Sequence, residues 1–283
     1  MHHTTRSVLA IVAALVIAPA MATPAAIDGF AIVRPASGVY ADEFNDGVAP
    51  PTGGPSSSFD SGPLASYALN SGASFAAGAE SGGLLSFAGA TYGNSCTSFG
   101  CNNSVQVTLQ TSTAVGSTNG LRQNQDFLVY ANWAFTTPDG EDRYRLRLGD
   151  TFRGASVSND VVDIDVVRTS SGQAQVRLLD IDLSTGVATV INSVTLAPGL
   201  TATNLVMSFE HQAFTNTVEA SFRLYNGVTP VMASFTLGTA TLFNGEDATQ
   251  AGFGVFAPVP EPASGALLAA GLGWLAWRRR RQA

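Results

Sequence analysis

A two-residue alternation of apolar and polar side chains runs through the second half of the chain and constrains its fold more than any other feature. In residues 218–225 the apolar positions are Val218, Ala220, Phe222 and Leu224, and the intervening positions are Glu219, Ser221, Arg223 and Tyr225. A strand that buries one face has this period, whereas an amphipathic helix repeats about every 3.6 residues. We therefore predict antiparallel strands with one face on a core and the other in water.

The same pattern recurs in segments that are separated by turn signals such as Tyr225-Asn-Gly227. The expected strands cover residues 66–69, 84–88, 127–135, 144–148, 161–167, 174–180, 187–196, 205–209, 218–225, 231–237 and 252–256. About a dozen short strands in about 240 residues, with no helix of three turns between the two ends, indicate an all-β chain. The predicted fold is a single two-sheet antiparallel sandwich of jelly-roll type.

One predicted hairpin can be given a register. Its two strands flank the turn signal Thr169-Ser-Ser-Gly172. Pairing Ile164 with Leu178 puts both side chains on a core face, and the same register puts Asp165 opposite Arg177 on the other face. A slip by one residue would mix the two faces, which burial forbids.

The N-terminal 22 residues have the three parts of a secretory signal peptide. They are a short polar start with Arg6, an apolar run at Val8–Ala18, and small residues that end in Ala20-Met21-Ala22. The apolar run is too short for a membrane span of about 20 residues. We predict an N-terminal signal helix that directs export through the Sec translocon and is removed by signal peptidase, so that the mature chain begins at Thr23.

The C-terminal end has its own three-part pattern. Pro260, Glu261 and Pro262 precede an apolar segment at 263–277, which is followed by Arg278, Arg279, Arg280 and Arg281. A basic cluster after an apolar segment stays on the cytoplasmic side, so we expect a hydrophobic helix that pauses in the inner membrane with the body outside. The segment is short for a permanent span, which suits a temporary anchor. An ordinary C-terminal membrane anchor is the alternative.

This tail resembles the PEP-CTERM sorting signal of Gram-negative bacteria. The resemblance implies recognition and processing by exosortase, a membrane-embedded protease-transpeptidase, and an association with exopolysaccharide and biofilm production. The chain then divides into a signal peptide at 1–22, a β-sandwich domain at 23–257 and a sorting signal at 258–283. The expected location is a transient inner-membrane anchor, followed by the cell surface or the extracellular space.

Composition removes several classes of function. All fourteen basic residues are arginines, so no lysine exists for a P-loop, a Schiff base or a general base. His211 is the only histidine of the mature chain, which excludes a three-histidine zinc site. Residues 23–262 keep nine arginines and all 21 acidic residues, a net charge of −12. That charge argues against nucleic acid and anionic membrane surfaces as partners.

Cys96 and Cys101 are the only cysteines of the chain. The signal peptide places them in an oxidising compartment, where a local disulfide is expected rather than redox chemistry. Two thiols without a nearby histidine make a poor metal site, and no metal ligand is predicted there.

The body is similar to concanavalin A-like lectin and glucanase sandwiches in the opening segment Asp42–Gly47, the strand at 127–135 and the closing strand Ala251–Phe256. The resemblance implies that the first and last strands pair. Glucanases of this kind carry Glu-x-Asp-x-x-Glu on a strand, and the nearest string here is Val-Val-Asp163-Ile-Asp165-Val, in which valines replace both glutamates. We therefore predict no catalytic residue, and we interpret the two aspartates as solvated partners of arginines.

Two further candidates have weaker signals. His211 falls at the end of a predicted strand and has no Gly-x-Ser-x-Gly serine to serve. The oxygen-bearing side chains of Asp42, Glu43, Asn45 and Asp46 are of the kind that calcium prefers. Their spacing is not that of an EF-hand, and turn chemistry explains them equally well. Structural calcium is thus an alternative to the predicted absence of any cofactor.

The arginine row of Arg143, Arg145 and Arg147 could grip an acidic polysaccharide, unless acidic residues on neighbouring strands neutralise it. The predicted function is non-enzymatic: an exported surface or extracellular-matrix protein that binds, or is embedded in, exopolysaccharide. One alternative is a carbohydrate-active enzyme, either a glycoside hydrolase or a lyase. A purely structural filler or an adhesin is another.

Overall fold

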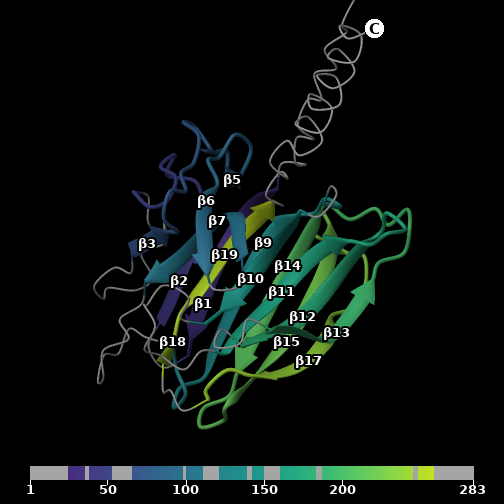
Figure 1. Cartoon of the computed structure of the whole chain (residues 1–283). Helices are drawn as coiled ribbons and strands as arrows, with labels where there is room; N and C mark the ends of the chain where they lie inside the picture. The colour runs from purple at the N-terminus through teal and green to yellow at the C-terminus, as the bar shows by residue number, and fades with distance from the viewer. Residues whose placement is uncertain are drawn as a thin grey trace, which may run out of the picture.

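In the computed structural model, the residues described are 25–35, 38–52, 66–97, 100–110, 121–138, 142–149, 160–182, 187–244 and 248–257. These residues form strands and connecting loops, and none of them is helical. Figure 1 shows two large antiparallel sheets stacked face to face. The predicted all-β antiparallel sandwich is thus confirmed. The two predicted terminal helices lie outside the described residues.

The nine-stranded sheet has the order β16-β15-β14-β9-β1-β5-β4, with β17 beside β15 and β2 beside β1. Its strands are β1 (Ala26–Arg34), β2 (Gly38–Asp42), β4 (Glu80–Ser81), β5 (Leu84–Ser86), β9 (Phe127–Ala134), β14 (Asn204–His211), β15 (Thr217–Asn226), β16 (Thr229–Pro230) and β17 (Phe235–Thr241).

The eight-stranded sheet has the order β13-β12-β11-β10-β19-β7-β3, with β6 beside β7. Its strands are β3 (Ser66–Leu69), β6 (Gly93–Thr97), β7 (Gly100–Gln110), β10 (Arg143–Leu148), β11 (Asp160–Arg168), β12 (Ala174–Asp182), β13 (Val187–Thr195) and β19 (Ala251–Ala257). A separate two-stranded ribbon joins β8 (Leu121–Arg122) to β18 (Ala248–Thr249).

The core lies between the two sheets and is rich in aromatic rings. Trp133 of β9 is fully buried, and its ring lies 5.0 Å from Tyr144 and 5.7 Å from Phe87. Phe253 of β19 packs 5.0 Å from Phe30 of β1. Trp133, Tyr144 and Phe253 lie on strands that the sequence pattern predicted, whereas Phe30 lies on β1, which the pattern did not predict.

The expected pairing of the first and last strands is wrong. β19 lies between β10 and β7, whereas β1 is in the other sheet. Both edges of β1 are already occupied, by β9 on one side and by β2 and β5 on the other, so no edge remains for β19. The two strands meet face to face across the core instead.

The predicted hairpin register is confirmed. β11 and β12 pair with Ile164 opposite Leu178 and Asp165 opposite Arg177. The strand expected at 231–237 begins only at Phe235, and Thr229 and Pro230 form a separate short pair with the end of β15.

Candidate functional site

The charged row on β10 and β11 is buried rather than solvated. Asp163 and Asp165 are 2% and 1% exposed, and Arg145 and Arg147 are nearly as buried. Arg147 donates from Nε and Nη2 to the two carboxylate oxygens of Asp163 at 2.6 and 2.7 Å, and Arg145 donates to the same carboxylate at 2.8 Å. The prediction of a water-facing row is wrong here, because these side chains pair with one another in a buried layer. Among the fully buried side-chain nitrogen and oxygen atoms of these four described residues, only the Nε of Arg145 lacks a hydrogen-bond partner.

Glycines of β19 let the backbone of β7 approach closely beside this network. Gly254 lies opposite Arg145 in the β10–β19 register, and a Cβ added to it would lie 2.5 Å from the carbonyl oxygen of Val105. The Arg145 guanidinium lies 3.5 Å from the ring centre of Phe256 on β19. It also donates a hydrogen bond to Gln106 on β7 at 2.8 Å. The arginine thereby links β10 to β7 across β19.

Electrostatics make Asp163 a counter-ion of the two arginines. Burial acts to raise the pKa of Asp163, but the guanidinium groups of Arg145 and Arg147 outweigh it and leave that pKa below its ordinary value. On β12, the hydrogen bond to Asp165 raises the pKa of Arg177. Asp163 therefore stays an ion-paired carboxylate, whereas burial raises the pKa of Asp165 above its ordinary value.

The outer face of the nine-stranded sheet, turned away from the core, has the opposite character. Strand registers align its side chains in rows across β9, β14, β15 and β17. The first row is Leu128, Glu210, Glu219 and Thr239; the second is Tyr130, Ser208, Ser221 and Thr236; the third is Asn132, Val206 and Arg223. All of these residues are half-buried or exposed. We call this surface the open face.

Three hollows lie along the open face. One of about 310 Å³ is lined by Tyr130, Tyr225, Ser208 and Ser221, and the two serine hydroxyls are hydrogen-bonded at 2.8 Å. A second, of about 360 Å³, surrounds Glu210 and contains threonine hydroxyls. The third, of about 700 Å³, adjoins the second at the end of β14. The face thus offers aromatic, hydroxyl and carboxylate groups in neighbouring rows.

Glu210 and Glu219 are the most unusual pair on the open face. They lie directly opposite each other on β14 and β15, and both are exposed. In the part of the chain that the structure describes, neither carboxylate has a hydrogen bond or ion pair. The nearest arginine along β15 is Arg223, which donates to the hydroxyl of Tyr225 at 3.3 Å. Like charges directly opposite destabilise a sheet.

A polar cluster borders the same face at the other end of β14. Asn204 donates to a carboxylate oxygen of Asp28 at 2.7 Å. Burial raises the pKa of Asp28, while hydrogen bonds from Asn204 and Asn132 offset part of this effect. The amide oxygen of Asn132 is buried and has no hydrogen-bond partner among the described residues. The cluster is thus held together by hydrogen bonds from two asparagines to one carboxylate.

His211 is the last residue of β14, as predicted, and it is buried. Its Nδ1 lies 2.9 Å from the carbonyl oxygen of Thr217, and its Nε2 lies 3.0 Å from that of Gln123. The ring packs 4.7 Å from Phe127 and 4.9 Å from Phe243. Both nitrogens are therefore engaged with backbone, and the imidazole holds the strand end to two loops.

The segment proposed for calcium is a turn. Asp42 is buried and accepts from the backbone amide of Phe44 at 2.9 Å, while Asp46 accepts from Val48 at 2.8 Å. Glu43, Asn45 and Asp46 are exposed. Within the described ranges, no three His, Cys, Asp or Glu side chains are arranged so that they could hold a metal ion.

Glu80 joins this turn through its side chain, which accepts from the amide of Gly47 at 2.9 Å. Burial, followed by the hydrogen bond and charge of Asp46, raises the pKa of Glu80 to about 7. The turn is thus held together by a carboxyl group that takes up a proton near neutral pH.

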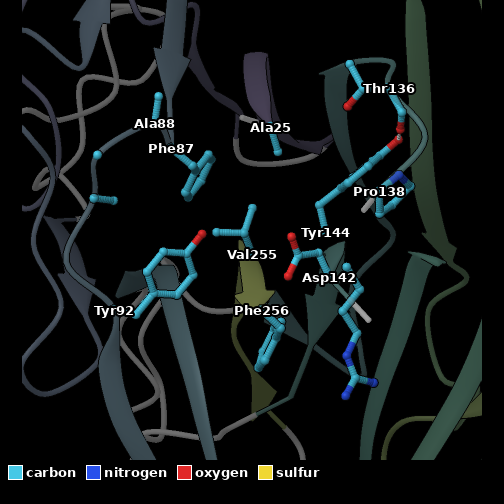
Figure 2. A pocket seen from close by; sticks show the side chains of 13 residues that line it. Ala25, Phe87, Ala88, Tyr92, Thr136, Pro138, Asp142, Tyr144, Val255 and Phe256 are labelled. Carbon is cyan, nitrogen blue, oxygen red and sulfur yellow. Dashed lines mark hydrogen bonds between the residues drawn. The ribbon is translucent and has the colours of Figure 1, made fainter. Parts of the chain in front are cut away.

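A separate pocket opens at one end of the sandwich, and we call it the end pocket (Figure 2). It has a volume of about 310 Å³ and lies where β1 and β10 begin and β19 ends. Its walls are mainly apolar, with Phe87, Val255 and Phe256 among them. Figure 2 shows the hydroxyl of Tyr92 and the carboxylate of Asp142 reaching into it from opposite walls.

Several predicted sites lie outside the described residues. They are the signal peptide at 1–22 and the sorting residues Pro260, Glu261, Pro262, Arg278, Arg279, Arg280 and Arg281. The backbones of Cys96 and Cys101 pair directly across β6 and β7, but their side chains are not among those described. The disulfide therefore stays a prediction. No helix within the described ranges is long and apolar enough to cross a membrane.

Comparison with known families identifies the C-terminal tail. Residues 258–281 match the model of the PEP-CTERM protein-sorting motif. The chain carries a PEP-CTERM motif. PEP-CTERM marks an exported protein whose C-terminal membrane-anchoring signal is processed by exosortase. No curated protein matches the sequence. Because the PEP-CTERM match covers only the tail, the role of the sandwich has to be inferred from its own surfaces.

Sequence reasoning missed the open face as a site. The alternation had identified Glu219, Ser221, Arg223 and Tyr225 as a polar face. It could not place Glu210 beside Glu219, because that juxtaposition depends on the register between β14 and β15.

Proposed function

We propose that this exported, exosortase-processed protein acts at the cell surface or in the extracellular matrix, where its β-sandwich binds polysaccharide without cleaving it. The PEP-CTERM motif supports export and processing. The observation that carries the binding proposal is the open face, a solvent-exposed sheet surface with three neighbouring hollows. Elongated polymers need such a surface, since successive sugar rings require successive contacts.

The residues of the open face suit sugars. Aromatic rings present broad apolar surfaces and, in tyrosine, a polar end, so Tyr130 and Tyr225 can stack on the C–H face of a sugar ring. Ser208, Ser221 and Arg223 supply hydrogen-bond donors and acceptors for ring hydroxyls. β9 alone spans about 27 Å at about 3.4 Å per residue, long enough for several rings.

The charges on the open face and on the mature body limit the class of polysaccharide that we expect to bind. The open face carries Glu210 and Glu219 against Arg223, and the mature body has a net charge of −12. A uronic acid polymer would meet repulsion there, whereas a neutral or amino-sugar polymer would not. The expected ligand is therefore a neutral or cationic exopolysaccharide.

Affinity electrophoresis in gels that contain neutral, amino-sugar or uronic acid polymers tests this proposal with protein secreted by exporting cells. Tyr130→Ala should weaken the retardation at least tenfold, because it removes a stacking surface. Val187→Ala, on the exposed strand β13, is the matched control and should behave as wild type. Equal retardation of the Tyr130 variant and the wild type would contradict the proposal.

A glycoside hydrolase is the second candidate, and the Glu210–Glu219 pair favours it. Side chains directly opposite on antiparallel strands have Cβ atoms about 4.5–5.5 Å apart. Retaining glycosidases hold their two carboxyl groups about 5–5.5 Å apart. If this function is correct, reducing ends should appear when the protein is incubated with polymer, and both Glu210→Gln and Glu219→Gln should abolish their release.

A further inference from the structure

The end pocket is distinct from the open face in position and shape. It is formed by the first residue of the described chain, Ala25, the turn at 87–92, residues 136–138, the start of β10 and the end of β19. None of its lining residues belongs to the rows of the open face. Its volume of about 310 Å³ is at the small end of the range for ligand sites, so it suits one ring rather than a polymer passing through.

The walls of the end pocket are rigid and apolar. Phe87, Val255 and Phe256 are each less than 10% exposed. The ring of Phe87 stacks on Trp133 at 5.7 Å, which fixes it to the core. Phe256 is held from its other side by Arg145, whose guanidinium lies 3.5 Å from its ring centre. Two aromatic walls of the cavity are therefore fixed by packing before any ligand binds.

Polar groups enter this apolar cavity at only a few points. The Tyr92 hydroxyl and the Asp142 carboxylate face each other across it (Figure 2). Burial raises the pKa of Tyr92, and the charge of Asp142 raises it further, so the phenol keeps its proton and can donate. Arg143 also lines the pocket; its side chain is 38% exposed and lies 3.9 Å from Asp165.

We infer that the end pocket binds a single neutral sugar ring, as a monosaccharide or as the terminal unit of a glycan. Phe87 and Tyr92 provide the apolar surface for the C–H face of the ring, and Asp142 with Arg143 provides an acceptor and donors for vicinal hydroxyls. The lining contains one acidic and one basic residue, Asp142 and Arg143, so their formal charges cancel, which favours a neutral ring over an acidic or basic one.

This inference extends the proposed function, on which it rests for the class of ligand. A domain with one surface for chain interiors and a separate pocket for a chain end can hold two polysaccharide chains at once. Such bivalent attachment raises the overall avidity without any new contact at either site. The protein would then act as a cross-linker of the matrix.

Saturation-transfer NMR on the secreted protein tests the inference with methyl glycosides. The probes are those of glucose, galactose, mannose and N-acetylglucosamine, with glucuronic acid and glucosamine as charged counterparts. We expect at least one neutral probe to bind and the charged probes to bind at least tenfold more weakly. Binding by none of the neutral probes at millimolar concentration, or equal binding by the charged ones, overturns the inference.

Ala88→Trp fills the pocket from its rim and should reduce binding of the neutral probe at least tenfold, while Tyr92→Phe should reduce it several-fold by removing only the hydroxyl. Val187→Trp adds the same bulk to an exposed site on β13 and should bind as wild type. Equal binding by the Ala88 variant, with unchanged near-ultraviolet circular dichroism, overturns the inference. Tyr130→Ala on the open face should leave the saturation-transfer signal of the neutral probe unchanged. Loss of polymer binding at the open face and loss of sugar binding in the end pocket can therefore be distinguished.

Discussion

Asp165 lies directly opposite Arg177 across β11 and β12, and the two side chains form a bidentate ion pair with N···O distances of 2.9 and 2.6 Å. The carboxylate is 1% exposed, and its next nearest cation, Arg143, is 3.9 Å away. The pair thus holds a buried charge in place and also fixes the register of the hairpin.

Arg177→Met should destabilise the protein by about 3 kcal/mol, because it leaves the Asp165 carboxylate buried without its bidentate partner. Urea unfolding of the wild type and the variant measures this free energy. The double variant Asp165→Leu, Arg177→Met should recover a large part of the loss, since no charge is then left unpaired. A loss below about 1 kcal/mol for the single variant would show that the pair contributes little.

Glu219→Gln should stabilise the fold by about 0.5 kcal/mol, because it removes the repulsion between two carboxylates that face each other on β14 and β15. The gain should shrink at 1 M salt, where exposed charges are screened within about 3 Å. Thermal unfolding at low and high salt measures both effects. A destabilising effect at low salt would mean that Glu219 has a favourable partner.

The local pattern of the sequence predicted the β11–β12 hairpin because both its determinants are local. Alternation assigned Ile164 and Leu178 to one face, and the intervening turn fixed which residues meet. The exposure of Asp163 was predicted incorrectly because the determinants of its burial are not local. Its burial depends on β19 lying beside β10 and β7 beside β19, where Arg145 reaches Gln106, and strand order is not encoded in a local pattern.

In the candidate sites, too, local features could be predicted from the sequence and tertiary ones could not. The polar character of Glu219 and Arg223 could be predicted from their alternation with apolar residues. The pairing of Glu219 with Glu210 and the meeting of Tyr92 with Asp142 in one pocket could not be predicted, because each joins separate segments through tertiary structure.

Glu80→Gln should change the pH dependence of stability. The pKa of Glu80 is raised from 4.5 to about 7, so between these values the folded protein keeps a proton that the unfolded chain has lost. The stabilisation that Glu80 contributes to the wild-type fold is therefore fully present below pH 4.5 and is lost as the pH rises through 7. At pH 8 the variant should be more stable by about 1 kcal/mol after solvent screening is considered, and at pH 4 the two should be equal. An unchanged difference across this range contradicts the assignment.

Cys96 and Cys101 should be joined in the secreted protein. Their backbones are direct partners across β6 and β7, and such partners have Cβ atoms close to the separation that a disulfide needs. The ring is short, so the bond should contribute less than the roughly 3 kcal/mol expected for a 15-residue loop. Alkylation under denaturing, non-reducing conditions, followed by mass measurement, should find no free thiol. Two alkylated cysteines would disprove the bond.

Replacing Pro260, Glu261 and Pro262 together by alanine should leave export intact but block removal of the tail, because the PEP-CTERM match at 258–281 includes this tripeptide. The variant should accumulate in the inner membrane as a form heavier than wild type by the mass of the uncleaved segment. Immunoblots of fractionated cells measure both size and location. Pro258→Ala, which changes a proline of the same segment but spares the tripeptide, is the matched control and should be processed normally. If the triple variant has the same size and location as wild type, exosortase does not depend on this tripeptide for processing.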